Sequence, residues 1–568
     1  MFVILAIAAA MPMLPTSGSY LTPFCSPATP PSTDEPDLCE GWPVSFNTPG
    51  GGFPYTPTLY DINGDGALEV FCTGGHTFGL SGDGSFLPGW PVTEMVYMGY
   101  GTNDQMPGPS CADMTGNGDP AVLWSERDWY AGSAYMWSFN GRLPGGGNLG
   151  AFPQEAPDDF SNALASPFVL GDSDNDGNLE AWSAHTLGNT GAYYRISGFD
   201  NAGSLLFTTD LDPTEQILCV YFGDLEGDEQ DEFLAVTLFG GTYRLFAFEP
   251  DGQISTGFPV SLISPGGNTT FGPPVIADLD GDGDLEILIG HNAGTTSYVQ
   301  ARHHDGNPVA GFPITIATQS QLFYFALGDM TGDQVPELVA LDNHLGSNYR
   351  AHVLNLGTGE PLPGWPVPVP NWPKGFPTVV DVDNDGVQDF VFVTDGGMLY
   401  ALSGEGAMIE SYPRTMTAPS ISGVAAGDID GDGLYELVAV TWNGWAYAWN
   451  TTGEVGAADW PMRGVDERNT GVFKGSGGPS GCDPSTPRQV FLSPVTNPSS
   501  GATRFMLPAG SDGTVTIFDA SGRVITEIPA GQGDCVSWNP GLHDRNGVYF
   551  ARLTCPSGTV SAKIVLLR

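Results

Sequence analysis

The feature that most constrains the fold is an acidic motif that recurs along most of the chain. The pattern Asp-x-(Asp/Asn/Thr/Glu)-x-(Asp/Asn)-x-x-x-Glu, seen in full as DLDGDGDLE at 278–286, places oxygen-bearing side chains at alternate positions and an acid at the ninth. Its first residue is Asp at 61, 113, 172, 224, 278, 329, 381 and 428, so successive copies start 47 to 59 residues apart. A period of about 50 residues with strand-like contents is typical of propeller blades and not of helical solenoids.

Each repeat contains the same four segments. An apolar run precedes the acidic loop (PPVIADLD), a β-rich run follows it (LEILIGHN), and a third run leads to a tight turn (YRLFAFEPDG). An aromatic residue and a proline close most repeats, as GWP at 41–43, 89–91 and 364–366 and as GFP at 257–259 and 311–313. We therefore expect an all-β chain with an eight-bladed β-propeller, or seven blades and an imperfect terminal repeat.

The composition of the chain and its repeat pattern change after residue 473. A Gly/Ser/Pro-rich linker covers 474–487, and 488–568 reads as about seven short strands of a small Ig-like β-sandwich. At the other end, 1–19 has the apolar run and small residues of a secretory signal peptide, cut after Ser19. We expect an N-terminal linker at 20–40, the propeller at 41–473, no stable membrane span, and a secreted or cell-surface location.

The charge of the chain limits its partners. The net charge of -47 comes from 65 acidic and 18 basic residues. Phosphate binding needs clustered Lys and Arg, so we expect no nucleic-acid partner. Of the 65 acids, 27 lie at positions one, three, five and nine of the repeated motif, which links much of the acidity to the loops.

The loops predict calcium sites. Side-chain oxygens at positions one, three, five and nine, with a backbone carbonyl at position seven, form the oxygen-only shell that Ca²⁺ prefers, while the loops contain no Cys or His for zinc or copper. The ninth-position acid and the strand-like flanks exclude an EF-hand. The candidate ligands are Asp61, Asn63, Asp65, Glu69; Asp172, Asp174, Asp176, Glu180; Asp224, Glu226, Asp228, Glu232; Asp278, Asp280, Asp282, Glu286; Asp329, Thr331, Asp333, Glu337; Asp381, Asp383, Asp385, Asp389; Asp428, Asp430, Asp432 and Glu436.

The eight loops are not equal. The loops at 224 and 329 lack glycine at position six, and the loop at Asp113 has Thr115, Asn117 and then Ala121 in place of the closing acid. We expect the Asp113 loop to bind weakly or not at all, and about five to seven calcium ions in total.

The eight cysteines form no CxxC metal pattern. In an oxidising compartment, local spacing favours the disulfides Cys25–Cys39 and Cys535–Cys555, and the remaining cysteines cannot be paired from the sequence.

The loops of nine residues, their spacing and the GWP segments resemble FG-GAP/VCBS-type repeats, the calcium-loop propeller family that includes the head of integrin α-chains. The resemblance covers roughly 40–473, and WPMRGVDERNTG at 460–471 is similar to the end of bacterial members. It implies a calcium-stabilised propeller whose loops bind proteins or glycans.

The tail is similar to the C-terminal sorting domains of the type IX secretion system, which have a FlgD-like Ig fold. The matching points are Asn497-Pro498, the turn with Asp519, Gly522 and Arg523, Trp538, Gly547-Val548-Tyr549 and the terminal 563–568. The segment SPVTNP departs from the family's usual Tyr-Pro-Asn-Pro. The resemblance implies export through that machinery, and a plain accessory Ig-like module is the alternative.

No motif for catalysis is found. The sequence has no GxSxG, HExxH or phosphate loop, and we interpret His303-His304 as a solvated pair. The aromatic residues of blade two, at 124, 129, 130, 135 and 137, favour blade packing over a sugar platform. We therefore expect a non-enzymatic binding or adhesion module for an unidentified glycan or protein, with a polysaccharide lyase or glycoside hydrolase as the alternative.

Overall fold

In the computed structural model, the chain divides into two compact units, Met1–Gly481 and Cys482–Arg568. The structure describes residues 37–46, 56–73, 76–92, 108–116, 118, 120–130, 134–156, 168–187, 193–212, 214–228, 230–240, 242–262, 274–279, 283–293, 296–318, 320–344, 348–420, 422–456, 458–473, 493–494, 503–506, 513–519, 523–530, 535–538, 540, 547–555 and 558–566. All regular elements among them are β-strands, and no described helix is long and apolar enough to cross a bilayer. The proposed signal peptide and the two linkers fall outside these residues, apart from 37–40.

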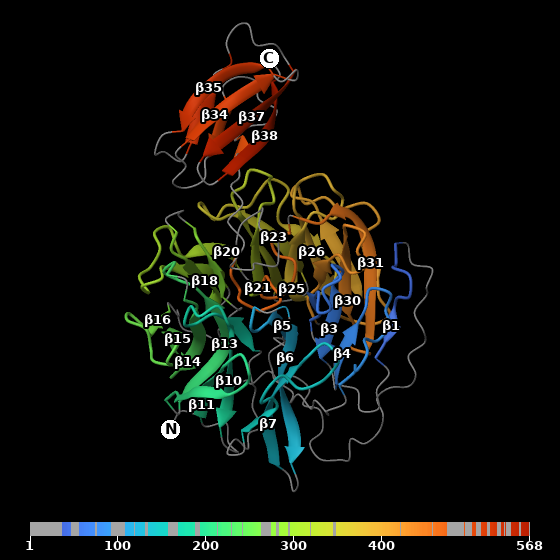
Figure 1. Ribbon diagram of the computed structural model, residues 1–568, viewed down its shortest axis with the longest axis vertical. Coiled ribbons are helices and arrows are strands. Elements are labelled where there is room, and N and C mark those ends of the chain that lie inside the picture. Colours follow the sequence, from blue (N-terminus) through green and yellow to red (C-terminus); the bar gives the residue numbers. More distant parts are fainter. Residues whose placement is uncertain are drawn as a thin grey trace, which may run out of the picture. The chain divides into compact units, whose positions relative to one another are not determined.

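The described strands of the first unit form eight antiparallel sheets (Figure 1). The first four sheets comprise β2 (Thr58–Tyr60), β3 (Glu69–Thr73) and β4 (Thr77–Leu80); β5 (Ser110–Asp113), β6 (Pro120–Tyr130), β7 (Ala134–Arg142) and β8 (Gln154–Ala156); β9 (Val169–Gly171), β10 (Glu180–Leu187), β11 (Tyr193–Phe199) and β12 (Leu205–Asp210); and β13 (Glu215–Gly223), β14 (Glu232–Phe239), β15 (Thr242–Phe248) and β16 (Val260–Ser261).

The next three sheets comprise β17 (Val275–Ala277), β18 (Glu286–Ala293), β19 (Thr296–Arg302) and β20 (Ile314–Thr318); β21 (Ser320–Gly328), β22 (Glu337–His344), β23 (Tyr349–Asn355) and β24 (Val367–Val369); and β25 (Pro373–Val380), β26 (Asp389–Thr394), β27 (Met398–Leu402) and β28 (Arg414–Thr415). The eighth contains β29 (Ala425–Gly427), β30 (Leu434–Val440), β31 (Trp445–Glu454) and β1 (Val44–Ser45).

The eight sheets close into a ring. The first strand of a sheet contacts that of the next, β2 with β5, β5 with β9, β9 with β13, β21 with β25 and β25 with β29, while β18 contacts β21 and a shared apolar cluster joins the sheets of β13 and β17. Contact of β29 with β2 completes the circle. The last sheet takes its fourth strand from the N-terminal part of the unit, because β1 pairs with β31 through Val44 and Ala446. This arrangement is a β-propeller.

Apolar side chains fill the interfaces between neighbouring sheets. One cluster joins the eighth sheet to the first through Val438 and Val70, both fully buried. The predicted GWP segments reinforce these interfaces: Trp42, Trp90 and Trp365 each donate an indole N–H to a carbonyl oxygen of the following sheet, at 2.7, 2.9 and 2.8 Å. The aromatic-proline repeat is therefore a contact between blades.

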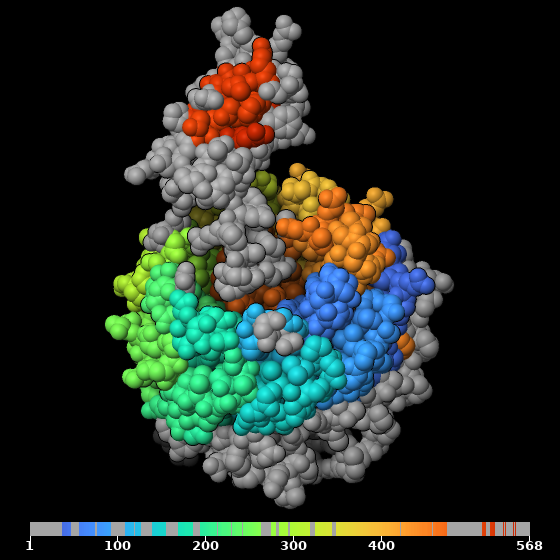
Figure 2. Space-filling view, in the orientation of Figure 1, coloured from blue at the N-terminus to red at the C-terminus, as the bar shows by residue number. Residues whose placement is uncertain are grey.

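Residues 459–473, which we call the central segment, lie along the first strands of the ring. Trp460 exchanges backbone hydrogen bonds with Val379 of β25, and the carbonyl of Pro461 accepts one from β29. Further on, the carbonyls of Glu467, Arg468 and Gly471 accept backbone hydrogen bonds from β5, β9 and β17. Figure 2 shows orange atoms at the centre of this unit, with the sheets following one another around them.

The second unit contains seven described strands in two antiparallel sheets. Trp538 and Tyr549 are buried there with ring centroids 5.0 Å apart. The sheets comprise β32 (Ser493–Pro494), β33 (Thr503–Met506) and β36 (Cys535–Trp538), and β34 (Gly513–Asp519), β35 (Val524–Ala530), β37 (Gly547–Cys555) and β38 (Gly558–Leu566). The number of strands agrees with the sequence, and the Ig-like sandwich stays a prediction.

The cysteines depart from one expectation. Cys39 carries a free, buried thiol that donates to Asn450 Oδ1 at 3.3 Å, which does not fit the predicted disulfide with Cys25, a residue outside the described part of the chain. Burial raises the pKa of the Cys39 thiol to about 12. The Cys535–Cys555 pairing stays a prediction, because the structure describes only the backbone at these two residues.

Candidate metal centres

The acidic loops connect the first strand of each sheet to the second. The residue that precedes the first aspartate pairs with the residue at position nine, as Tyr60 with Glu69 and Gly427 with Glu436. The second strand begins on the position-nine acid in the sheets of β3, β10, β14, β18, β22 and β26. The strand pairing thus fixes both ends of each loop and holds its carboxylates close together.

The position-nine acids, which we call the closing acids, are bound in the same way in seven loops. One oxygen of each accepts the backbone N–H of the second loop residue at 2.8 to 3.0 Å, and each residue is at most 5% exposed. The closing acids are Glu69, Glu180, Glu232, Glu286, Glu337, Asp389 and Glu436. This backbone contact does not use the second oxygen, which contacts Asn63 in Glu69 and His303 in Glu286, while in Glu436 the buried Oε1 has no hydrogen bond at all.

The first aspartate orders the turn of its loop. Asp428 Oδ1 accepts the N–H groups of Gly431 and Asp432 at 2.7 and 3.1 Å, and its Oδ2 accepts that of Gly433 at 3.0 Å. The same pattern surrounds Asp61 and Asp381. The glycines at positions four and six have positive φ, 78° at Gly431 and 86° at Gly433, a conformation that other residues adopt with strain.

Three loops bring their carboxylates to one point. Within each set, one oxygen per residue lies within 4.8 Å of the others. The sets are Asp172, Asp174 and Glu180; Asp381, Asp383 and Asp385; and Asp428, Asp430 and Glu436. These are predicted ligands, and the distances suit ligands that share one cation of the size of Ca²⁺.

The electrostatics of the loops favour a bound cation. Burial, and then nearby loop carboxylates, raise the pKa of Glu69, Glu180 and Glu337 to about 7, of Asp389 and Glu436 to about 8, and of Glu232 to about 9. Among the described residues, no lysine or arginine pairs with these six acids. A cation in the loop would compensate the charge that burial penalises.

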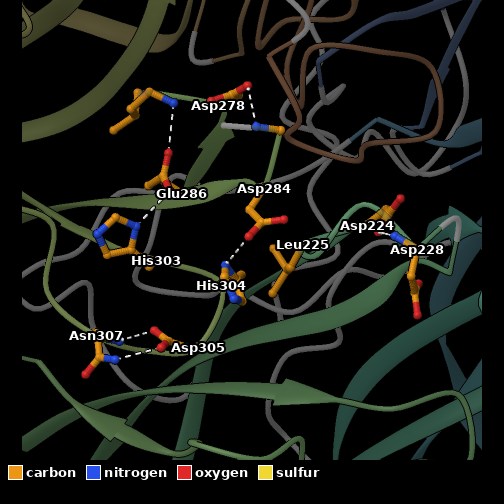
Figure 3. A network of polar contacts seen from close by, with 12 residues as sticks. Asp224, Leu225, Asp228, Asp278, Asp284, Glu286, His303, His304, Asp305 and Asn307 are labelled. Atoms are coloured by element: carbon orange, nitrogen blue, oxygen red, sulfur yellow. Dashed lines mark hydrogen bonds and ion pairs between the residues drawn. The ribbon is translucent and has the colours of Figure 1, made fainter. Parts of the chain in front are cut away.

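The loop at 278 differs from the others, as Figure 3 shows. Its closing acid, Glu286, contacts His303 Nδ1 through Oε1 at 2.9 Å, and Asp284 contacts His304 Nδ1 at 3.1 Å. The prediction of a merely solvated histidine pair is therefore wrong, because each ring faces a carboxylate of this loop. The missed signal is the position of the pair in the tight turn after β19, beside the acidic loop. Asp280 and Asp282 lie outside the described residues.

Two other loops show individual features. In the loop at 61, the amide of Asn63 donates to Glu69 Oε1. In the loop at 329, where Thr331 replaces an acid, the backbone N–H of Asp329 donates to Asp459 Oδ2 at 2.5 Å. Asp459 belongs to the central segment and is 4% exposed, and its pKa is raised to about 7 by burial and by Asp329. Sequence reasoning did not find Asp459, because it lies 130 residues from Asp329.

The loop at 113 keeps the frame but lacks the closing acid. Asp113 accepts backbone N–H groups of Thr115 and Gly118. Ala121 occupies position nine and is fully buried, while Asn117 lies outside the described residues. Weak or absent metal binding at this loop stays a prediction.

Adjacent loops are hydrogen bonded to one another around the ring. The N–H of Leu68 donates to the carbonyl of Asp428, that of Leu179 to Met114, and that of Asp231 to Asp172, at 2.8 to 2.9 Å. Leu285 likewise donates to Leu225, which joins the loops of Figure 3. These hydrogen bonds connect the backbone of one loop to that of the next.

The remaining candidate residues have structural surroundings. Trp124 of blade two is 3% exposed, in agreement with packing, and the side chains of the other four aromatics predicted there are not described. Asp342 is buried with His352 Nε2 at 2.9 Å and the Arg350 guanidinium at 2.7 Å, an ion-paired group within one sheet.

Comparisons with known proteins agree with the repeats. Residues 224–289 and 381–439 match the family described as FG-GAP-like repeat. Among curated proteins, no sequence matches the chain.

Similar solved structures include BBS1N in complex with ARL6DN, with 12% identity, 61% of this chain and 92% of that chain covered, and a TM-score of 0.38. BamB from Moraxella catarrhalis has 11% identity, covers 69% and 96%, and has a TM-score of 0.42. Sqt1 from Saccharomyces cerevisiae has 10% identity, covers 73% and 100%, and has a TM-score of 0.44. The propeller described above rests on the strand pairings of this chain.

Proposed function

We propose that this chain is a secreted or cell-surface binding or adhesion protein whose FG-GAP-type propeller is stabilised by calcium ions. The observation that carries the calcium proposal is the row of buried closing acids, of which six have raised pKa values and no lysine or arginine partner in the described residues. Buried carboxylates without a compensating charge cost several kcal/mol, and a divalent cation supplies that charge.

The residues present fit such an ion. Carboxylate, amide and hydroxyl oxygens from the loops would hold Ca²⁺, with the closing acid offering the oxygen that the backbone leaves unused. In the loop at 428, a carboxylate oxygen of Glu436 lies within 4.8 Å of ligand oxygens of Asp428 and Asp430, and the buried Glu436 Oε1 has no hydrogen bond. When bound, the ion would tie the first two strands of a sheet together, and the hydrogen bonds between loops would extend its effect to the neighbouring sheet.

Calcium dependence of stability tests this proposal directly. Thermal unfolding of the full chain in EDTA, in CaCl₂ and in MgCl₂ should give the highest Tm in CaCl₂, because ligand binding to the native state adds to its stability. Calorimetric titration should give about five to seven ions per chain. An unchanged Tm on adding CaCl₂ to the EDTA-treated chain would refute calcium binding.

The binding role is a separate proposal with a separate test. Calcium would make the propeller a rigid frame, and the ligand-binding residues would lie on loops outside the acidic repeat, in keeping with the location of binding residues on loops of rigid scaffolds. A glycan array and a pull-down of surface proteins, each with and without EDTA, should show saturable, calcium-dependent binding. Release of products from a panel of pectins and alginates would instead support the enzymatic alternative.

Export is proposed from the two ends of the chain. Cleavage after Ser19 should be visible by N-terminal sequencing of exported protein. Deletion of 488–568 should retain the propeller inside the cell if this unit is a sorting domain. Export of the shortened chain at the normal level would favour the plain accessory module.

A further inference from the structure

The central segment carries a buried cation that the calcium sites do not use. Arg463 is 7% exposed, and its guanidinium carbon lies 4.7 Å from the centre of the Phe376 ring of β25. Its Nε has no hydrogen-bond partner. Arg463 follows the residues that pair with β25 and β29, so it is held in the middle of the ring.

The surroundings of Arg463 come from three sheets. Cys219 and Tyr221 of β13 and Tyr324 of β21 lie within electrostatic range of the guanidinium, in addition to Phe376. Tyr221 is 4% exposed, and its hydroxyl forms no hydrogen bond with another described residue. The ring of Tyr221 packs on Gly471 of the central segment, where an added Cβ would lie 2.3 Å from the ring. The phenol ring is thereby fixed against the central segment.

Among the described residues, no carboxylate neutralises this guanidinium. Within the described ranges, Asp and Glu side chains form no ion pair with Arg463, although the chain has 65 acids. Three other arginines are paired with acids, Arg244 with Glu215, Arg350 with Asp342 and Arg414 with Asp37. Two buried arginines donate to neutral oxygens instead, Arg142 to Asn148 and Arg302 to the Ser261 carbonyl. Burial accordingly lowers the pKa of Arg463. A buried charge without a partner is strongly destabilising, and a bound anion would remove that cost.

We propose that Arg463 is the anchor of an oxyanion site at the centre of the propeller, and that the site takes a small monovalent carboxylate. A guanidinium offers two parallel N–H donors that match the two oxygens of a carboxylate, and the Tyr221 hydroxyl adds a further donor. The aromatic rings of Tyr221, Tyr324 and Phe376 suit a flat ligand. One guanidinium compensates one negative charge, so a divalent phosphate or sulfate would be disfavoured inside a chain of net charge -47.

Titration of the full, calcium-saturated chain with formate and acetate tests the site. Calorimetry at ionic strength held constant with NaCl should show saturable binding of one carboxylate per chain. Arg463→Gln should abolish it, and Tyr221→Phe, which keeps the ring, should weaken it about tenfold through loss of one charge-assisted hydrogen bond. Arg195→Gln is the matched control, because Arg195 pairs with Asp210 in the third sheet and should bind carboxylate as wild type does.

The outcomes separate this inference from the calcium proposal. If Arg463→Gln does not fold, the site is still tested by carboxylate binding to Tyr221→Phe and by comparing formate with phosphate and sulfate on the wild-type chain. Binding of formate that is equal in Tyr221→Phe and wild type, or no saturable binding of either carboxylate, would overturn the inference. Tighter binding of phosphate or sulfate than of formate would overturn the carboxylate assignment. None of these results depends on whether EDTA changes the Tm.

Discussion

Replacing Glu436 with glutamine should stabilise the protein without calcium and should remove the stabilisation that calcium gives through this loop. Without metal, the pKa of Glu436 is raised from 4.5 to about 8 by burial and by the carboxylates of Asp430, Asp432 and Asp428. At pH 7 the side chain is therefore protonated in the folded chain and ionised in the unfolded one. The difference of about 2.5 units between pH 7 and the ordinary pKa corresponds to about 3 kcal/mol in favour of unfolding, at about 1.4 kcal/mol per unit.

Glutamine removes this penalty and keeps the hydrogen bond with the Ile429 N–H. Its new amide group can donate to a loop carboxylate, as the Asn63 amide does to Glu69 in the first loop. In EDTA at pH 7, Glu436→Gln should therefore raise the free energy of unfolding by up to about 3 kcal/mol. With calcium, the same change removes a charged ligand from one site, and loss of that site at a calcium concentration 100 times its Kd lowers the free energy by about 2.7 kcal/mol. This loss offsets the gain, so the two chains should have similar free energies of unfolding in calcium.

Urea unfolding of both chains in EDTA and in CaCl₂ measures the free energy of unfolding in each buffer. Glu215→Gln is the control, because Glu215 is equally buried but pairs with Arg244 away from the loops. That change should destabilise the chain by a similar amount in both buffers. Equal destabilisation by Glu436→Gln in EDTA and in calcium would refute the assignment of Glu436 as a ligand.

Further measurements address the loops as a set and the contacts between blades. In EDTA, the free energy of unfolding should fall as the pH rises from about 4.5 towards 9, because the closing acids have raised pKa values and must ionise on unfolding. Calcium should flatten this pH dependence. A flat curve in EDTA would contradict the electrostatic reasoning. Calorimetry should count one ion fewer in Asp381→Asn but the same number in Asp113→Asn, and a lost ion in the second variant would show that the loop at 113 is a site. Trp365→Phe should cost about 1–3 kcal/mol in urea unfolding, because the Gly404 carbonyl loses its indole donor and a cavity forms; an unchanged midpoint would show that the contact is dispensable.

The sequence predicted those features that its local pattern encodes. The repeat located the acidic loops, and the alternation of apolar runs located the strands before and after them, because position nine must pair with the residue before the loop. The number of described sheets in the first unit equals the number of repeats. Candidate ligands at 172, 381 and 428 meet in space as the spacing predicts.

Features that depend on long-range packing were not predicted. The central segment resembled the end of related chains, but its sequence gives no indication that it hydrogen bonds with the first strands of five sheets. For the same reason, burial of Arg463 and the contact of Asp459 with the loop at 329 could not be found. His303 was misinterpreted because strand alternation says which face a side chain takes and does not say which loop lies there.

The pairing of β1 with β31 has a consequence for how the chain folds during its synthesis. The eighth sheet needs Val44 and Ala446 together, and the central segment that crosses the ring follows still later, at 459–473. A ribosome must therefore release more than four hundred further residues before Val44 finds its partner. Until then, the earlier sheets form an open arc with unpaired strand edges, and such a state is prone to aggregation. A chain truncated before residue 446 could not close the ring, and we expect chaperones to bind it or proteases to degrade it.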